Sequence, residues 1–378
     1  MKLGIDNIDQ NLHYFKGKRV GLITNPTGIN SEYISTIDVL KEKVNLVALF
    51  SPEHGVRGNL QAGVQFDSYI DEESGIIVHS LYTKDKRPTK EMLDSLDVLC
   101  IDIQDGGSRF YTYIYTMAYA MMACKEYDKE FVVFDRPNPI NGVDFEGNIL
   151  DIEYRSFIGY YPILQRHGLT IGELALMFNE EFEIGCKLRV IKMEDWDRNK
   201  YYDELGLLWV MPSPNFPSVD TGVVYNATCI FEGTNISEGR GTTSPFEVVG
   251  APFINPEKLA NKLNSLNLGG VYFRPTYFTP TFSKHEKEMC GGVQVHVINR
   301  DEFLPVYTGW TMLDIIRHMY ADDFKINDPY VKGGKKMLEF NTGCDYITKG
   351  EYSLDEQFAI LKEDTEKFKE TRSKYLIY

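Results

Sequence analysis

The first half of the chain alternates short apolar runs with amphipathic stretches. Apolar residues at helical spacing predict helices at 31–43, 89–96 and 112–127. The apolar runs between them predict buried strands at 20–24, 44–50, 76–81, 98–103, 131–134 and 188–192. Strands that are apolar throughout and separated by helices are typical of a parallel sheet covered on both faces. The pattern therefore predicts an α/β fold with a mostly parallel sheet.

Helix start signals are clear at three places. Thr170 and Glu173 form a capping box, Asn255 precedes a proline at the first helical position, and Ser353 opens a second box. Beyond about residue 226 the strand pattern is less regular, with candidates at 270–274 and 293–299. We expect a larger domain over 1–226 and a smaller α+β domain over 227–378.

Polar residues follow four of the expected strands at the point where each strand ends. They are the stretches NPTG at 25–28, PEHG at 52–55, DIQDGGSR at 102–109 and DRPNP at 135–139. In an open parallel sheet, ligands bind outside the carboxyl ends of the strands. Each stretch alone could be an ordinary turn, because Asp, Asn, Gly and Pro favour turns. Four of them at one edge favour a functional rim.

A second polar stretch, FEGTNISEGRGTT at 231–243, opens the second half. It sets two glutamates and an arginine among small residues that allow the backbone to approach a ligand. The segment MPSPNFP at 211–217 precedes it and is stiffened by proline. An interdomain linker is the alternative interpretation, but a linker does not require this set of charged residues.

The composition of the chain excludes some classes of binding partner. The chain has 378 residues, a net charge of −15 and a pI of about 5.0, which argues against nucleic acid. No apolar run approaches the roughly 20 residues needed to span a membrane.

The six cysteines lack CxxC spacing, so we expect reduced core residues. The start, MKLGIDNIDQ, has no apolar signal region; we expect a cytoplasmic protein, or a secreted or periplasmic one if the chain is a trimmed mature form.

Familiar cofactor motifs are missing from the sequence. The first strand is followed by TNPTGIN and not by GxGxxG, and GxxxxGK[ST], GxSxG and HExxH do not occur. We therefore expect neither a cofactor nor a metal. A rim rich in Glu, Asp and Arg suits glycoside hydrolysis, in which one carboxyl group protonates the leaving oxygen and another attacks or stabilises the sugar cation.

The chain resembles the NamZ-type exo-β-N-acetylmuramidases of bacteria. The matching stretches are SPEHGVRG, DIQDGGSRFYTY, DRPNPINGVDFEGNIL, RHGLTIGELA, WVMPSPNFPS and FEGTNISEGRGTTSPFEVVGAPF, in that order from about residue 20 to residue 253. The resemblance implies a Rossmann-like N-terminal domain that carries the site and a C-terminal domain that closes the cleft. It also implies release of terminal N-acetylmuramic acid from non-reducing ends of peptidoglycan fragments. Members of the family usually have an export signal, which we do not expect in this chain from its first residues.

Glu53 is the expected chief catalytic carboxylate, with His54 as a possible proton partner. Glu232 is the first choice for the second carboxylate, and Asp102, Asp105 and Glu238 are alternatives. Arg57, and after it Arg240, is expected to bind the carboxylate of the lactyl ether through a bidentate contact. Some of the rim arginines could instead neutralise rim carboxylates. The further candidates for substrate binding are Gln104, Arg109, Tyr111, Asp135, Arg136, Asn138, Asn215 and Asn235.

Two rivals from other classes remain. A non-catalytic protein that binds cell-wall sugars would keep the arginines and aromatic residues but would need no acid. A nucleotide-dependent enzyme on a parallel sheet would need a phosphate-binding loop, which the sequence lacks.

Overall fold

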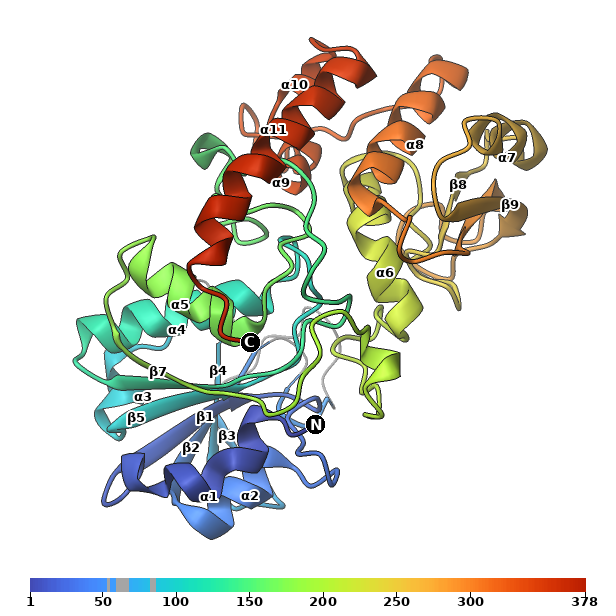
Figure 1. Ribbon diagram of the computed structural model, residues 1–378. Coiled ribbons are helices and arrows are strands. Elements are labelled where there is room, and N and C mark those ends of the chain that lie inside the picture. The colour runs from blue at the N-terminus through green and yellow to red at the C-terminus, as the bar shows by residue number, and fades with distance from the viewer. Residues whose placement is uncertain (53–54, 59–67, 82–85) are drawn as a thin grey trace.

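The computed structural model describes residues 1–52, 55–58, 68–81 and 86–378. It contains a large sheet flanked by helices and a smaller region in which helices pack on a short sheet (Figure 1). The expected α/β class and the smaller second region are confirmed. The helices are α1 Ile8–Asn11, α2 Thr36–Lys43, α3 Lys90–Asp94, α4 Tyr113–Glu126, α5 Ile171–Glu180, α6 Val219–Thr228, α7 Pro256–Asn264, α8 Pro305–Met319, α9 Met337–Thr342, α10 Tyr346–Lys349 and α11 Leu354–Ser373.

The large sheet has the doubly wound strand order. Its order is β3-β4-β2-β1-β5-β6-β7, and every neighbouring pair is parallel except β3 with β4. The chain moves outward from β1 in one direction and then returns to continue from β5 in the other, as in Rossmann-like folds. The strands are β1 Arg19–Thr24, β2 Asn45–Ser51, β3 Tyr69–Ile70, β4 Ile77–Ser80, β5 Val98–Asp102, β6 Glu130–Phe134 and β7 Lys187–Ile191.

Both faces of this sheet are buried, as the apolar strands predict. Alternate residues of β5 point to opposite sides: Val98 and Cys100 join the cluster that contains α2, whereas Leu99 and Ile101 join the cluster that contains α4 and α5. The second cluster continues into the smaller region. The smaller region therefore shares a core with one face of the sheet.

Helix α2 begins later than the sequence pattern predicts. The expected helix at 31–43 starts at Thr36, because the Ser35 hydroxyl accepts a hydrogen bond from the Ile37 amide and caps it. The residues before it form a turn around Asn30, whose side chain accepts from the Glu32 and Ile34 amides. Local side-chain hydrogen bonds replace the first turn of the helix.

The smaller region contains a three-stranded antiparallel sheet in the order β8-β10-β9. Its strands are β8 Val248–Ala251, β9 Val271–Phe278 and β10 Cys290–Val297. The expected strands at 270–274 and 293–299 correspond to β9 and β10, and β8 was not expected. The three helix starts are confirmed, since Thr170, Asn255 and Ser353 each accept a backbone amide hydrogen bond.

The chain returns to the large sheet at its end. Helix α11 runs from the smaller region toward the sheet (Figure 1). There the Ile377 amide donates to Glu173 at 3.0 Å and the Tyr378 hydroxyl donates to Asp135 at 2.6 Å. A division at residue 226 stays a prediction, and α6 runs through that position.

Glu146 provides another link between the two regions. Its buried carboxylate accepts a hydrogen bond of 2.7 Å from the Tyr307 amide in the first turn of α8. Burial raises the pKa of Glu146 to about 7. The charged form is therefore disfavoured in the folded chain relative to the unfolded chain.

The central anchor of the sheet is an ion pair between β5 and the loop after β6. Arg136 donates to both oxygens of Asp102, at 2.5 and 3.0 Å, and both side chains are about 1% exposed. Arg136 also donates to the Ile29 carbonyl, and the Thr36 hydroxyl donates to Asp102. The pair ties together the loop after β1, the start of α2, β5 and the loop after β6.

We expect Asp102→Asn to lower the free energy of unfolding by about 3–5 kcal/mol, because it leaves the buried Arg136 without its counter-charge. Urea denaturation measures the change. The control is Asp97→Asn, which breaks the exposed pair between Asp97 and Arg19 at the other end of the same strands. It should cost no more than about 1 kcal/mol. Equal losses in the two variants would contradict the anchoring role.

A pH dependence follows from Glu146. Its folded pKa of about 7 lies above the ordinary value of 4.5, so its contribution to stability is complete below pH 4.5 and is lost as pH rises through about 7. Glu146→Gln keeps an oxygen for the Tyr307 amide and cannot ionise. We expect the stability of the wild type relative to this variant to decline between pH 4.5 and 7. Parallel stability profiles for the two proteins would show that Glu146 does not titrate in this range.

Candidate active site

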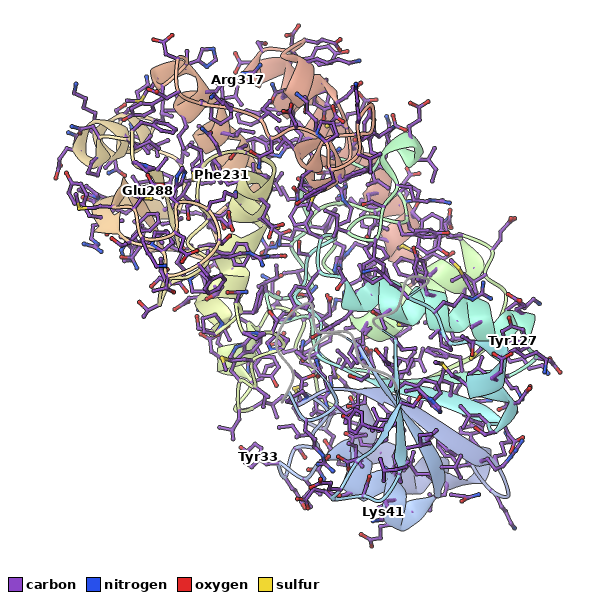
Figure 2. The ribbon with its side chains drawn as sticks, turned by 180° about the vertical axis from the view of Figure 1, so that it is seen from behind. Tyr33, Lys41, Tyr127, Phe231, Glu288 and Arg317 are labelled. Atoms are coloured by element: carbon purple, nitrogen blue, oxygen red, sulfur yellow. The ribbon has the colours of Figure 1, made fainter. Side chains whose placement is uncertain are left out.

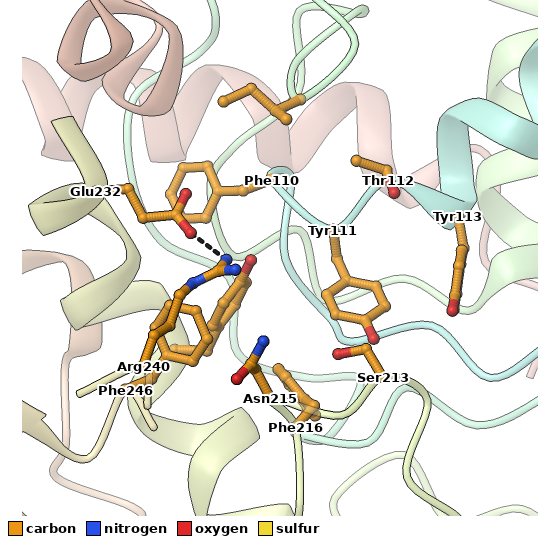
Figure 3. Close-up of a pocket in the computed structure, with 12 residues that line it drawn as sticks. Phe110, Tyr111, Thr112, Tyr113, Ser213, Asn215, Phe216, Glu232, Arg240 and Phe246 are labelled. Carbon is orange, nitrogen blue, oxygen red and sulfur yellow. Dashed lines mark hydrogen bonds and ion pairs between the residues drawn. The ribbon is translucent and has the colours of Figure 1, made fainter. Parts of the chain in front are cut away.

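A pocket lies between the loop that leads into α4 and the part of the chain that follows α6 (Figure 3). Its volume is about 170 Å³, below the roughly 300–1,000 Å³ typical of drug-sized ligand sites, so it suits a single sugar ring. It takes residues from the loop that leads into α4, from the proline-stiffened segment, and from α6 and the loop after it. Its lining is Phe110, Tyr111, Thr112, Tyr113, Ile158, Ser213, Asn215, Phe216, Tyr225, Glu232, Arg240 and Phe246.

Glu232 and Arg240 form an ion pair on the pocket wall (Figure 3). The Arg240 Nε lies 3.4 Å from an oxygen of the buried Glu238, so one guanidinium lies between two carboxylates. Burial acts to lower the pKa of Arg240. The charges of Glu232 and Glu238 outweigh burial and raise this pKa. Glu232 and Glu238, which the sequence analysis offered as alternatives for the second carboxylate, thus both contact Arg240.

Lys284, on the hairpin between β9 and β10, holds this loop from behind. Its ammonium lies 2.8 Å from Glu238 and donates to the carbonyls of Phe231 and Ile236, at 2.6 and 2.8 Å. These carbonyls flank Glu232 along the chain. The lysine thereby fixes the backbone on both sides of the pocket carboxylate and balances the second glutamate.

Two glycines explain the small residues of the loop. Gly239 and Gly241 have φ of 81° and 82°, which residues with a Cβ rarely adopt. A Cβ at Gly241 would lie 2.5 Å from the Phe282 carbonyl oxygen of the hairpin. The loop can therefore pack against the hairpin and present Arg240 only with glycine at these positions.

Aromatic rings line much of the rest of the pocket, and the ring of Phe246 also lies against the Arg240 guanidinium, 5.2 Å from ring centroid to Cζ (Figure 3). Tyr111 contacts Phe216 edge-on, with ring centroids 5.1 Å apart, and Tyr225 contacts Phe246 at 4.7 Å. The Tyr113 hydroxyl donates to the Pro212 carbonyl at 2.6 Å and so holds the proline segment against the start of α4. Pockets for small molecules commonly combine such apolar faces with a few polar groups.

Most of the rim residues chosen from the sequence do not line this pocket. Asp102 and Arg136 form the buried ion pair, and Asp135 accepts from Thr170, the Gly172 amide and Tyr378. The Gln104 side chain donates to the carbonyls of Asp105 and Pro137, and the Asn138 side chain donates to Leu169. These buried groups connect the rim loops to one another. The expected neutralisation of rim carboxylates by arginine is confirmed for Asp102.

Asp105 lies behind the pocket wall. It is buried, accepts from the Gly107 amide at 2.8 Å and lies 3.4 Å from Nε2 of the buried His167. Its neighbour Gly106 packs on the ring of Tyr111, where a Cβ would come within 2.8 Å. Asp105 therefore supports the lining residue Tyr111 and does not itself line the pocket.

Three further predicted binders have protein partners elsewhere. Arg109 is fully buried and donates to four carbonyls, including Asn341 and Thr342 at the end of α9, and burial lowers its pKa to about 10. Asn235 hydrogen-bonds the backbone of the 323–325 segment. Arg57 makes a two-pronged contact with Asp71, at 3.2 and 3.0 Å.

Four of the predicted residues do line the pocket: Tyr111, Asn215, Glu232 and Arg240. Glu53 and His54 lie outside the described residues, just after β2 ends at Ser51. The sequence analysis missed the other lining residues. Most of these belong to quoted stretches that could have indicated them, whereas Ile158 and Tyr225 carried no signal.

Family models match nearly the whole chain. The model described as exo-beta-N-acetylmuramidase NamZ, N-terminal, matches residues 20–220, and the corresponding C-terminal model matches residues 223–378. The chain belongs to the NamZ family. The family expectation drawn from the sequence motifs is thus confirmed, and the pocket lies between the parts that the two models match.

The relatives agree with this assignment. Peptidoglycan beta-N-acetylmuramidase NamZ of Bacillus subtilis (strain 168) is 51% identical over 365 residues, which are 96% of this chain and 87% of the relative. Crystal structures of two DUF1343 family proteins from Bacteroides fragilis NCTC 9343 are also similar. One has a TM-score of 0.90 at 38% identity and the other 0.78 at 33%; each comparison covers 100% of this chain and 98% of the other.

Other expectations concern metals, membranes and cysteines. In the described part of the chain, His, Cys, Asp and Glu side chains form no group that could hold a metal ion. No described helix combines the length and apolar character needed to cross a membrane. All six cysteines are free and buried, as expected.

Proposed function

We propose that the protein is an exo-acting glycoside hydrolase that releases terminal N-acetylmuramic acid from the non-reducing ends of peptidoglycan fragments during cell-wall turnover. The observation that carries the proposal is the Glu232–Arg240 pair on an aromatic-lined pocket of monosaccharide size. The B. subtilis relative named for β-N-acetylmuramidase activity on peptidoglycan supports it.

The two carboxyl groups of the reaction take different roles in this proposal. Because Glu232 lies in an ion pair with Arg240, we assign it the charged role, in which a carboxylate attacks or stabilises the sugar cation. Glu53, which follows the end of β2 at the carboxyl edge of the sheet, takes the acid role and protonates the leaving oxygen.

We expect Glu53→Gln and Glu232→Gln each to lower kcat on a chromogenic N-acetylmuramic acid glycoside by at least about 100-fold, because neither amide can supply a proton or a negative charge. Glu32→Gln, at an exposed loop position, is the control and should leave kcat unchanged. Wild-type rates in either variant would remove that residue from the mechanism. If the wild type binds the sugar and releases none over hours, the protein is a cell-wall sugar-binding protein instead.

Arg240 becomes the first candidate for the group that binds the lactyl carboxylate. It lines the pocket, whereas Arg57 does not and already holds Asp71, whose pKa it lowers to about 2. A guanidinium has five N–H donors. The contacts of Arg240 with Glu232 and Glu238 use its Nε and one Nη, so the other Nη can bind a ligand carboxylate.

We expect Arg240→Met to reduce the preference for the muramic glycoside over the N-acetylglucosamine analogue by at least about tenfold in kcat/KM. Arginine favours the lactyl carboxylate, and methionine keeps much of the bulk without the charge. Arg57→Met is the matched comparison and should change this ratio little. A ratio that collapses only in Arg57→Met would assign the lactyl group to Arg57.

A further inference from the structure

A second cavity lies far from the large sheet, at the C-terminal end of α8. It is an open groove of about 510 Å³. Arg317 marks it at one end of the molecule in Figure 2, opposite Lys41 of α2. The groove is formed by the end of α8, the segment after it and the residue before α9, and its lining is Arg317, His318, Ala321, Phe324, Lys325, Ile326 and Lys336.

The groove is basic in an otherwise acidic protein. Three permanent cations, Arg317, Lys325 and Lys336, line it together, and no carboxylate does. Within the described parts of the chain, none of the three belongs to a salt bridge, whereas His318 has Asp314 as its partner at 3.3 Å. Asp314 lines the adjoining cavity beside Arg317, but the three cations still leave an excess of positive charge along the groove, which an anionic ligand neutralises.

An apolar floor accompanies these cations. Phe324 and Ile326 line the groove and also a smaller adjoining cavity, whose walls include Trp310, Leu313 and Leu338. Arg317 belongs to both cavities and is fixed by donating to the Ile347 carbonyl at 2.9 Å. This arrangement fits a ligand that carries carboxylates beside aliphatic groups better than it fits a bare inorganic anion.

The groove is joined through the backbone to the loop of the active-site pocket. The Asn235 side chain accepts a hydrogen bond from the Lys325 backbone amide at 2.9 Å. The Asn235 backbone amide donates to the Lys325 carbonyl. The Asn327 side chain donates to the carbonyls of Glu232 and Thr234, at 3.3 and 2.9 Å. Lys325 therefore lies on a segment paired directly with the loop that carries Glu232.

We propose that this groove binds the carboxylate-bearing peptide of peptidoglycan, separately from the terminal sugar held in the pocket. The cations bind the peptide carboxylates, and Phe324 and Ile326 contact aliphatic side chains such as those of alanine. The choice of peptide rests on the proposed function, and the presence of an anion site rests on the groove itself.

The test uses the full chain and a double variant, Lys325→Gln with Lys336→Gln, which removes two charges and retains Arg317. The matched control is Lys258→Gln with Lys262→Gln, two exposed lysines of α7 that lie in no salt bridge of the described chain. Calorimetry measures binding of an N-acetylated, alanine-containing peptide with two free carboxylates. The fully amidated peptide and inorganic phosphate are measured beside it, and thermal unfolding verifies that each variant is folded.

We expect the groove variant to bind the carboxylate peptide about fivefold to tenfold more weakly than the wild type, and the α7 variant to bind it as the wild type does. The amidated peptide should bind weakly to all three proteins. In turnover, the groove variant should lose kcat/KM on peptide-bearing fragments and keep it on the chromogenic glycoside, which has no peptide.

Equal peptide affinity in the wild type and the groove variant would overturn the proposal. Phosphate that binds as tightly as the peptide, with the same loss in the variant, would overturn the choice of peptide. If the wild type hydrolyses neither substrate, the proposed function fails, and loss of peptide binding in the groove variant alone would still support the anion site.

Discussion

The architecture of the active-site edge depends on one buried ion pair. Arg136 and Asp102 meet at the point where the sheet reverses its strand order, and together they hold the loops that leave β1, β5 and β6. Two fully desolvated charges carry a large cost unless their geometry and further hydrogen bonds are good. The bidentate contact, the Ile29 carbonyl and the Thr36 hydroxyl meet that condition. A rim held in this way can present the lining residues just before α4 in a fixed position.

The pocket is completed by residues that come from far along the chain. Phe110 and Tyr111, which follow a rim loop, supply part of the aromatic lining, whereas Glu232, Arg240 and Phe246 come from the chain after α6, which the β9–β10 hairpin supports through Lys284. Arg109 performs a similar task on the other side, since its guanidinium connects the rim to the end of α9. Neither part of the chain forms the pocket by itself, and its lining residues fall within both family models.

Sequence alone predicted the features that depend on local patterns. Continuous apolar runs predicted the parallel strands, and side-chain caps predicted the helix starts at Thr170, Asn255 and Ser353. It also identified the loops that meet at the rim, but could not tell lining residues from supporting ones. Asp, Arg and Asn look the same in a sequence whether they face a ligand or a neighbouring loop. Tyr225 was missed because a buried helix residue that lines a pocket resembles any core residue. Strand β8 was missed because half of it is Gly250 and Ala251, which are uncommon in strands.

The hydrogen bond between Tyr378 and Asp135 has a consequence for synthesis. The two residues are separated by 243 positions. A ribosome that adds roughly 5–20 residues per second makes that span in about 12–50 s. Until the end of this interval, the Asp135 carboxylate cannot form its hydrogen bond with Tyr378. The large sheet can therefore assemble early, but this end of β6 reaches its final environment only after the last turn of α11 has been released. Folding of the first half and closure of the molecule are in this way separate events in time.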